Sequence, residues 1–101
     1  MSTNLHISQS QITKFCQQHY IARLALFGSV LRDDFHPDSD VDVLVEFAEG
    51  HVPDFFRFVD MQDQLGEIFE RQVDLHTPNS LSKYFRQEVL DLAQVVYEQA
   101  G

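Results

Sequence analysis

The stretch that decides the fold spans residues 24–47, LALFGSVLRDDFHPDSDVDVLVEF. It contains an apolar strand, a Gly-Ser turn, a short linking segment, and a second strand that begins with two aspartates one residue apart. Because strand side chains alternate between faces, Asp40 and Asp42 are predicted to share one face, and the valines between and after them the other. One face of this strand is therefore predicted to be a charged site and the other part of the core. Neighbouring carboxylates repel each other, and a divalent cation is the best explanation for finding them together.

The length and charge of the chain restrict its function. A chain of 101 residues is predicted to form one small domain, residues 1–101, because it can bury only a single core. The 16 acidic residues against 7 Lys and Arg give a formal net charge of -9, which argues against a nucleic-acid binder. No apolar run is long enough to span a membrane and the N-terminus does not resemble a signal peptide, so a cytoplasmic protein without membrane contact is predicted.

The N-terminal part is predicted to be a helix followed by a strand. Ser8 or Ser10 can cap the helix. Its apolar stripe follows the helical period and consists of Ile12, Phe15, Cys16 and His19. Cys16 is the only cysteine, which excludes an internal disulfide, and it is interpreted as a small core residue because no basic neighbourhood activates it. The apolar run 21–27 is predicted to be an interior strand.

The Gly28-Ser29 pair ends that strand, and residues 30–34 are predicted to start a helical turn. A strand, a Gly-Ser turn and a helix start present free backbone N–H groups and a hydroxyl at a positive helix end, which suits phosphate oxygens. The alternative is an ordinary turn in which Ser29 only caps the helix. Arg32 lies one turn further on and is either a second contact to the same anion or a solvated side chain.

The segment after the acidic strand is predicted to be a loop over 48–53 and then a helix from the cap Asp54 to about Phe69. The apolar stripe of this helix is predicted to consist of Phe55, Phe58, Val59, Leu65, Ile68 and Phe69. Phe56 and Met61 lie off the stripe, so the helix has more apolar surface than one core face needs. That excess indicates either broad burial or a surface for a partner.

Residues 72–76, QVDLH, are predicted to form a third strand. Val73 and Leu75 share one face and leave Asp74 on the other. If this strand lies beside the second one, Asp74 joins Asp40 and Asp42. After Thr77-Pro78, a final helix is predicted from a cap at Asn79 or Ser80, with an apolar stripe of Leu81, Phe85, Val89, Leu92 and Val96.

Three interpretations of the acidic site compete. A calcium loop would use positions 1, 3, 5 and 12, which are Asp38, Asp40, Asp42 and Glu49. That loop needs glycine at its sixth position, where this chain has Val43, and it would not continue as a strand. Solvated surface acids would explain single carboxylates but not three that converge. Phosphoryl or nucleotidyl transfer at Mg²⁺ explains all three, since two ions held by such carboxylates clamp the attacking and leaving oxygens.

The order and spacing of these motifs support a resemblance to a known family. The motifs are GSVLR at 28–32, PDSDVD at 37–42 and VDL at 73–75. With them the chain resembles the minimal nucleotidyltransferases, whose fold is shared with the palm of polymerase beta. The resemblance implies an α+β domain with a small mixed sheet and helices packed on one face. Two positions depart from the commonest pattern, because Asp33 and Glu70 stand where glycine is frequent.

The resemblance also implies roles for the site residues. Asp40 and Asp42 would bind two Mg²⁺ ions, and Asp74 would bind the catalytic ion and help to deprotonate the acceptor hydroxyl. Gly28 and Ser29 would hold the β- and γ-phosphates of the nucleotide, with ATP as the donor. Arg32 is the further nucleotide-binding candidate.

The resemblance extends to a partner. Minimal nucleotidyltransferases include antitoxins of all-helical HEPN ribonuclease toxins, some of which they inactivate by attaching AMP to a tyrosine. A chain of 101 residues leaves no room for a second domain that presents an acceptor, so a hetero-oligomer with such a toxin is predicted. Two alternatives remain open: a binding module that neutralises its toxin by contact alone, and a nucleotidyltransferase that modifies a small molecule such as an aminoglycoside.

Overall fold

The computed structural model describes residues 8–28, 40–84 and 86–99. Ser29, Arg32 and Asp33, together with the helical turn predicted at 30–34, lie outside the described residues. The elements are α1 (Gln9–Gln18), β1 (Ile21–Phe27), β2 (Val41–Phe47), α2 (Phe55–Phe69), β3 (Val73–His76), η2 (Pro78–Ser80), α3 (Arg86–Leu92) and β4 (Gln94–Glu98). No helix in these ranges is both long and apolar enough to traverse a lipid bilayer.

The four strands form one mixed sheet in the order β3-β2-β1-β4. β1 pairs antiparallel with both β2 and β4, whereas β2 and β3 are parallel. The strands predicted from the sequence are confirmed, and β1 occupies the interior position that its apolar run indicated. Arg23 interrupts that run, and it forms an ion pair of 3.0 Å with Glu46, its cross-strand neighbour on β2.

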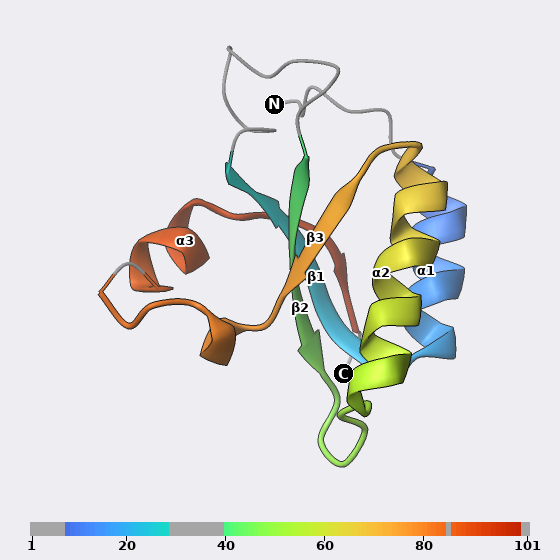
Figure 1. Ribbon diagram of the computed structural model, residues 1–101, viewed down its shortest axis with the longest axis horizontal. Helices are drawn as coiled ribbons and strands as arrows, with labels where there is room; N and C mark the ends of the chain where they lie inside the picture. Colours follow the sequence, from blue (N-terminus) through green and yellow to red (C-terminus); the bar gives the residue numbers. More distant parts are fainter. Residues whose placement is uncertain (1–7, 29–39, 85, 100–101) are drawn as a thin grey trace.

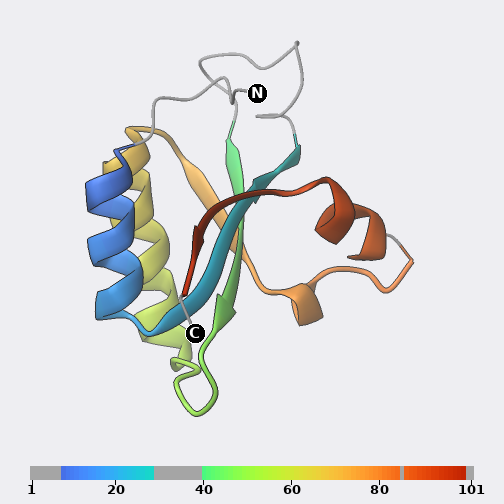
Figure 2. The same cartoon turned by 180° about the vertical axis from the view of Figure 1, so that it is seen from behind.

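Helices α1 and α2 lie side by side against one face of the sheet, as Figures 1 and 2 show from opposite sides. α1 contacts β1 and β4, and α2 contacts β3. The main core lies between these helices and the sheet and contains buried residues from both layers: Ile12, Phe15, Cys16, Ile21, Leu24, Leu26, Val41, Val43, Val45, Met61, Leu65, Phe69, Val73 and Leu75. Cys16 is fully buried there, which confirms its interpretation as a core residue, and burial raises the pKa of its thiol to about 12.

The second face of the sheet carries a smaller apolar cluster. Ala25, Leu44 and Leu81 are buried in it, with Val89 and Leu90 of α3 packed against them. α3 therefore lies on the opposite side of the sheet from α1 and α2, as Figure 1 shows. The predicted helix layer is present on one face, and the second face is divided between this cluster and polar side chains.

The final helix predicted from Asn79 or Ser80 through Val96 is confirmed only over Arg86–Leu92 and is wrong at both ends. The chain forms the 3-10 turn η2, a seven-residue α3 and then β4, which pairs with β1. The spacing of the apolar residues satisfied a helical period, but residues 95–97 are Val-Val-Tyr, a sequence with high strand propensity. Pairing these residues with β1 also covers a strand edge that would otherwise expose unpaired backbone groups.

Helix α2 has the predicted bounds, and its cap is confirmed because the backbone N–H of Arg57 donates to Asp54 Oδ1 at 2.8 Å. The predicted apolar stripe is partly wrong. Phe55 is 73% exposed, whereas Met61, which was predicted to lie off the stripe, is fully buried. The buried face runs through Met61, Leu65 and Phe69, because packing against the sheet rather than the first apolar residue sets the rotation of the helix.

Candidate active site

The site is organised by the register of two neighbouring parallel strands. Asp42 of β2 lies directly opposite Asp74 of β3 in the ladder, so the prediction that Asp74 would join the acidic strand is confirmed. Residues opposite each other on adjacent strands point to the same face, and both carboxylates therefore lie on the face away from α1 and α2. An edge contact holds β3 in place, since the backbone N–H of Leu75 donates to the side chain of Gln62 on α2 at 2.9 Å.

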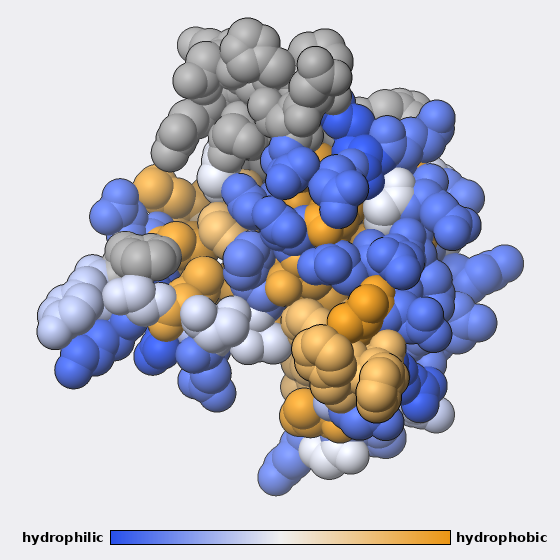
Figure 3. All heavy atoms as spheres, in the orientation of Figure 1, coloured by the Kyte–Doolittle hydropathy of each residue, from blue (hydrophilic) through white to orange (hydrophobic). Residues whose placement is uncertain are grey.

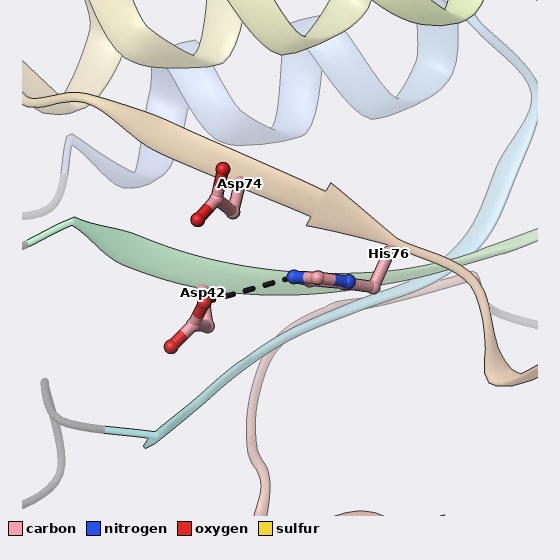
Figure 4. A group of neighbouring side chains, drawn as sticks. All are labelled: Asp42, Asp74 and His76. Carbon is pink, nitrogen blue, oxygen red and sulfur yellow. Dashed lines mark ion pairs between the residues drawn. The ribbon is translucent and has the colours of Figure 1, made fainter. Parts of the chain in front are cut away.

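His76 is the third member of the cluster. It lies two residues after Asp74 on β3 and therefore projects from the same face. Its Nε2 is 3.6 Å from Asp42 Oδ1, and its ring packs edge-on against Phe27 of β1, with ring centroids 5.4 Å apart. Figure 4 shows the imidazole lying along β2 with its nitrogen directed at the Asp42 carboxylate.

Gly28 approaches Asp42 from the end of β1. Its φ of +78° lies in the left-handed region that disfavours side chains, and a Cβ at this position would overlap Asp42 Oδ2. One oxygen of Asp42 thus lies against a glycine backbone and the other faces His76. Glycine is required at this turn for its backbone conformation and for the space that the carboxylate occupies.

Several groups change the charge state of Asp42. Burial is the largest effect and raises the pKa of this carboxyl above its ordinary value. His76 opposes that effect chiefly through its charge, whereas the negative charges of Asp74 and Asp40 raise the pKa further. A bound cation would relieve this repulsion, so the electrostatics of the cluster fit a cation site.

The structure brings only part of the predicted site together. Asp42 and Asp74 converge with His76, and one ligand atom from each lies within 4.8 Å of the others. Asp40 precedes β2, is exposed, and does not belong to this group. Gly28 lies against Asp42, whereas Ser29 and Arg32 lie outside the described residues, so their predicted phosphate contacts stay predictions.

His76 was not among the residues predicted from the sequence. The signal was present, since Asp74 and His76 are two residues apart on a predicted strand and must share a face. A histidine beside two aspartates is a plausible ligand set for a divalent cation. Two carboxylates, an imidazole and a glycine that admits the carboxylate of Asp42 together make an arrangement that could hold a metal ion and orient a phosphate.

Comparison with known proteins gives this geometry a context. Residues 9–96 match the nucleotidyltransferase domain, which is most of the chain. The chain is 34% identical over 77 residues to the protein adenylyltransferase MntA of Thermococcus cleftensis, a match covering 76% of this chain and 74% of that protein. It is 30% identical over 90 residues to a predicted protein adenylyltransferase of Methanocaldococcus jannaschii, covering 89% of this chain and 95% of the relative.

Solved structures show the same fold. A crystal structure of a toxin-antitoxin complex with AMP-PNP aligns with a TM-score of 0.72 at 22% identity, over 92% of this chain and 75% of the other. A predicted minimal nucleotidyltransferase aligns with a TM-score of 0.68 at 29% identity, over 84% of this chain and 85% of the other. The chain therefore shares its overall fold with these proteins.

Proposed function

We propose that this chain, which belongs to the nucleotidyltransferase domain family, is a protein adenylyltransferase. It uses ATP and two Mg²⁺ ions to attach AMP to a tyrosine of a HEPN-type toxin. By this modification it acts as the antitoxin. The observation that carries this proposal is the direct pairing of Asp42 with Asp74 on one face of the sheet, beside Gly28. The relative MntA is named a protein adenylyltransferase, and several structural neighbours are MntA complexes with a toxin.

The residues present fit the metal that this chemistry uses. Two carboxylates on adjacent strands supply hard oxygen ligands, and the mutual repulsion at Asp42 favours a cation. Asp42 and Asp74 would hold it, with Asp40 at the exposed margin of the site. Bound Mg²⁺ supplies charge stabilisation at the phosphoryl oxygens and alignment of the attacking and leaving groups.

The chain's own residues have separate tasks in the transfer. Asp74 orients the acceptor hydroxyl and accepts its proton as the bond between that oxygen and the α-phosphorus forms. The bond from the α-phosphorus to the bridging oxygen breaks, and pyrophosphate leaves with the bonding electrons. Gly28 is proposed to bind the departing phosphates through its backbone N–H. Ser29 and Arg32 are proposed to add contacts there.

The test is the intact mass of a HEPN-type toxin, measured after incubation with this protein, ATP and Mg²⁺. The expected result is a mass increase by one or more AMP groups. Asp74→Asn should abolish the increase, because it removes the charge with little change in shape. Asp63→Asn is the matched control, since this exposed aspartate lies on α2, against the other face of the sheet. An unmodified partner that is nevertheless neutralised would refute the enzymatic proposal.

One observation favours the second candidate, neutralisation by contact alone. The start of α2 and the preceding loop expose an apolar patch, visible over the start of that helix in Figure 3. The apolar patch consists of Val52, Phe55, Phe56 and Val59, which are 38% to 82% exposed. An exposed apolar patch of this kind is typical of a surface that binds another protein. The two candidates separate at low antitoxin dose: Asp74→Asn should bind the toxin but fail to protect cells if transfer is required.

A further inference from the structure

We propose that His76 is a third ligand of the cation held by Asp42 and Asp74, so that this site selects a transition-metal ion such as Mn²⁺ over Mg²⁺. The inference rests on the proposed function for the location of the metal site, and it changes which ion that site prefers. Two carboxylates alone would explain a site with oxygen ligands, but they do not explain the imidazole that lies beside them.

The distances allow one ion to contact all three side chains. Their ligand atoms lie within 4.8 Å of one another. Two atoms on opposite sides of one ion are about 4–5 Å apart, twice a metal–ligand bond of roughly 2.0–2.5 Å. The 3.6 Å between His76 Nε2 and Asp42 Oδ1 is longer than a good hydrogen bond and falls within the range that separates two ligands of one ion.

The surroundings hold both groups in orientation. Phe27 packs edge-on against the His76 ring, and the parallel register fixes the height of Asp74 beside Asp42. A Cβ at Gly28 would overlap Oδ2 of Asp42, and Oδ1 is the oxygen that faces His76. The carboxylate therefore presents one oxygen toward the imidazole, which is the arrangement that a mixed nitrogen and oxygen site needs (Figure 4).

The chemistry of the ligands decides the metal. Mg²⁺ prefers oxygen ligands and gives up its water reluctantly, so an imidazole adds little to its binding. Mn²⁺, Co²⁺ and Zn²⁺ accept an imidazole nitrogen readily, and their affinities for such sites follow the order of the divalent first-row metals. A histidine on the same face as two aspartates therefore shifts the preference of the site toward these ions.

The experiment uses the full chain without an affinity tag and Mn²⁺ alone as the probe. Pulsed electron paramagnetic resonance should detect a directly bound nitrogen in the wild type. His76→Gln should remove that nitrogen signal and weaken Mn²⁺ binding by about tenfold or more, while Mg²⁺ binding, measured by competition, changes less than about twofold. His51→Gln is the matched control, since His51 is exposed and stacks on Tyr20 instead of lying at the cluster.

A second variant separates loss of a ligand from loss of structure. His76→Asp keeps a ligand at this position but replaces its nitrogen with oxygen. It should therefore remove the nitrogen signal and reduce the ratio of Mn²⁺ affinity to Mg²⁺ affinity. A nitrogen signal that is missing in the wild type, or that persists in His76→Gln, overturns the inference. So does an equal loss of Mn²⁺ and Mg²⁺ affinity in that variant. Absence of AMP transfer alongside a histidine-dependent signal refutes the proposed function alone, and transfer without the signal refutes the ligand alone.

Discussion

The two faces of β2 are built for different purposes. On one face, Val41, Val43 and Val45 are fully buried in the main core under α1 and α2. On the other face each residue has a different role. Asp42 belongs to the site, Leu44 belongs to a small apolar cluster, and Glu46 forms an ion pair with Arg23. Each strand residue therefore serves either packing or a local task, but not both.

This difference teaches where the stability and the chemistry of the molecule reside. The main core joins two helices to all four strands through buried or partly buried side chains, so its loss would affect the whole fold. The opposite face contributes three buried residues and holds charged groups, one of which, Asp42, burial makes unfavourable in its ionised form. Substitutions of the charged residues on the site face should change catalysis strongly and folding little, and substitutions on the core face should do the reverse.

The largest expected effect is the loss of transfer in Asp42→Asn. The change removes a charge that holds the cation while keeping the shape of the side chain, so we expect transfer to fall by about 10³-fold or more, which corresponds to several kcal/mol. The rate of AMP incorporation into the helical partner measures it. Near-normal turnover in Asp42→Asn with Mg²⁺ or Mn²⁺ would refute the role of Asp42 as a metal ligand.

The same variant should stabilise the metal-free protein at neutral pH. The folded-state pKa of Asp42 is raised above its unfolded value of about 3.9, so the stability associated with its protonated form is present below that value and is lost as pH rises through the folded-state pKa. Asparagine does not ionise and avoids the loss. Thermal unfolding with a chelator should therefore show a higher midpoint for Asp42→Asn at neutral pH, and the difference should shrink on acidification. A lower midpoint at neutral pH would contradict the electrostatic account.

The next largest effect compares two buried leucines on adjacent strands. Leu24 lies in the main core and Leu44 in the small cluster of the site face. Leu24→Ala should lower the free energy of unfolding by about 3–5 kcal/mol, and Leu44→Ala by roughly 2–3 kcal/mol, because fewer neighbours surround its cavity and the site can relax. Urea unfolding of both variants measures the difference. Equal losses would show that the second face is as important for stability as the first.

A smaller effect is expected at Gly28, which follows β1. Gly28→Ala places a Cβ against the Asp42 carboxylate in a left-handed backbone conformation, which costs about 1–2 kcal/mol for a residue other than glycine. Because the new methyl group also displaces Asp42, transfer and Mn²⁺ affinity should fall by more than the loss of stability explains. Gly50→Ala is the control, since Gly50 also has a positive φ but would have no atom within 4 Å of a new Cβ. If Gly28→Ala and Gly50→Ala reduce transfer and stability equally, backbone strain alone would explain the effect of Gly28→Ala.

The sequence predicted the parts of this fold that depend on local pattern. Alternation along a strand was enough to put Asp42 and Asp74 on the face away from the core, but it left open whether the two strands are neighbours, which the pairing of β2 with β3 establishes. It could not predict β4, since a helical spacing that ends at Val96 changes to a strand only when the open edge of β1 is known. It misplaced Met61 for a related reason, because the rotation of a helix depends on what it packs against. The same alternation puts His76 on the face of Asp74, but a lone histidine at a strand end does not by itself indicate a metal ligand.

The smallest effect is expected at the C-terminal end of α2, a helix that packs on the core face of the sheet. Glu70 is the C-cap residue, with φ 57° and ψ 37°, and its backbone N–H donates to the carbonyl of Gly66. This left-handed conformation closes the helix and lets the chain enter β3, but it is unfavourable for any residue with a side chain. Glycine adopts it readily, so Glu70→Gly should raise the free energy of unfolding by about 1 kcal/mol. Because Glu70 is exposed, its side chain contributes little packing that the change would remove. Glu67→Gly, one turn earlier in the helical part of α2, is the opposite control and should destabilise the protein by about 1 kcal/mol. If urea unfolding shows Glu70→Gly to be destabilising as well, the side chain of Glu70 must contribute more to the stability of this helix end than the backbone conformation costs.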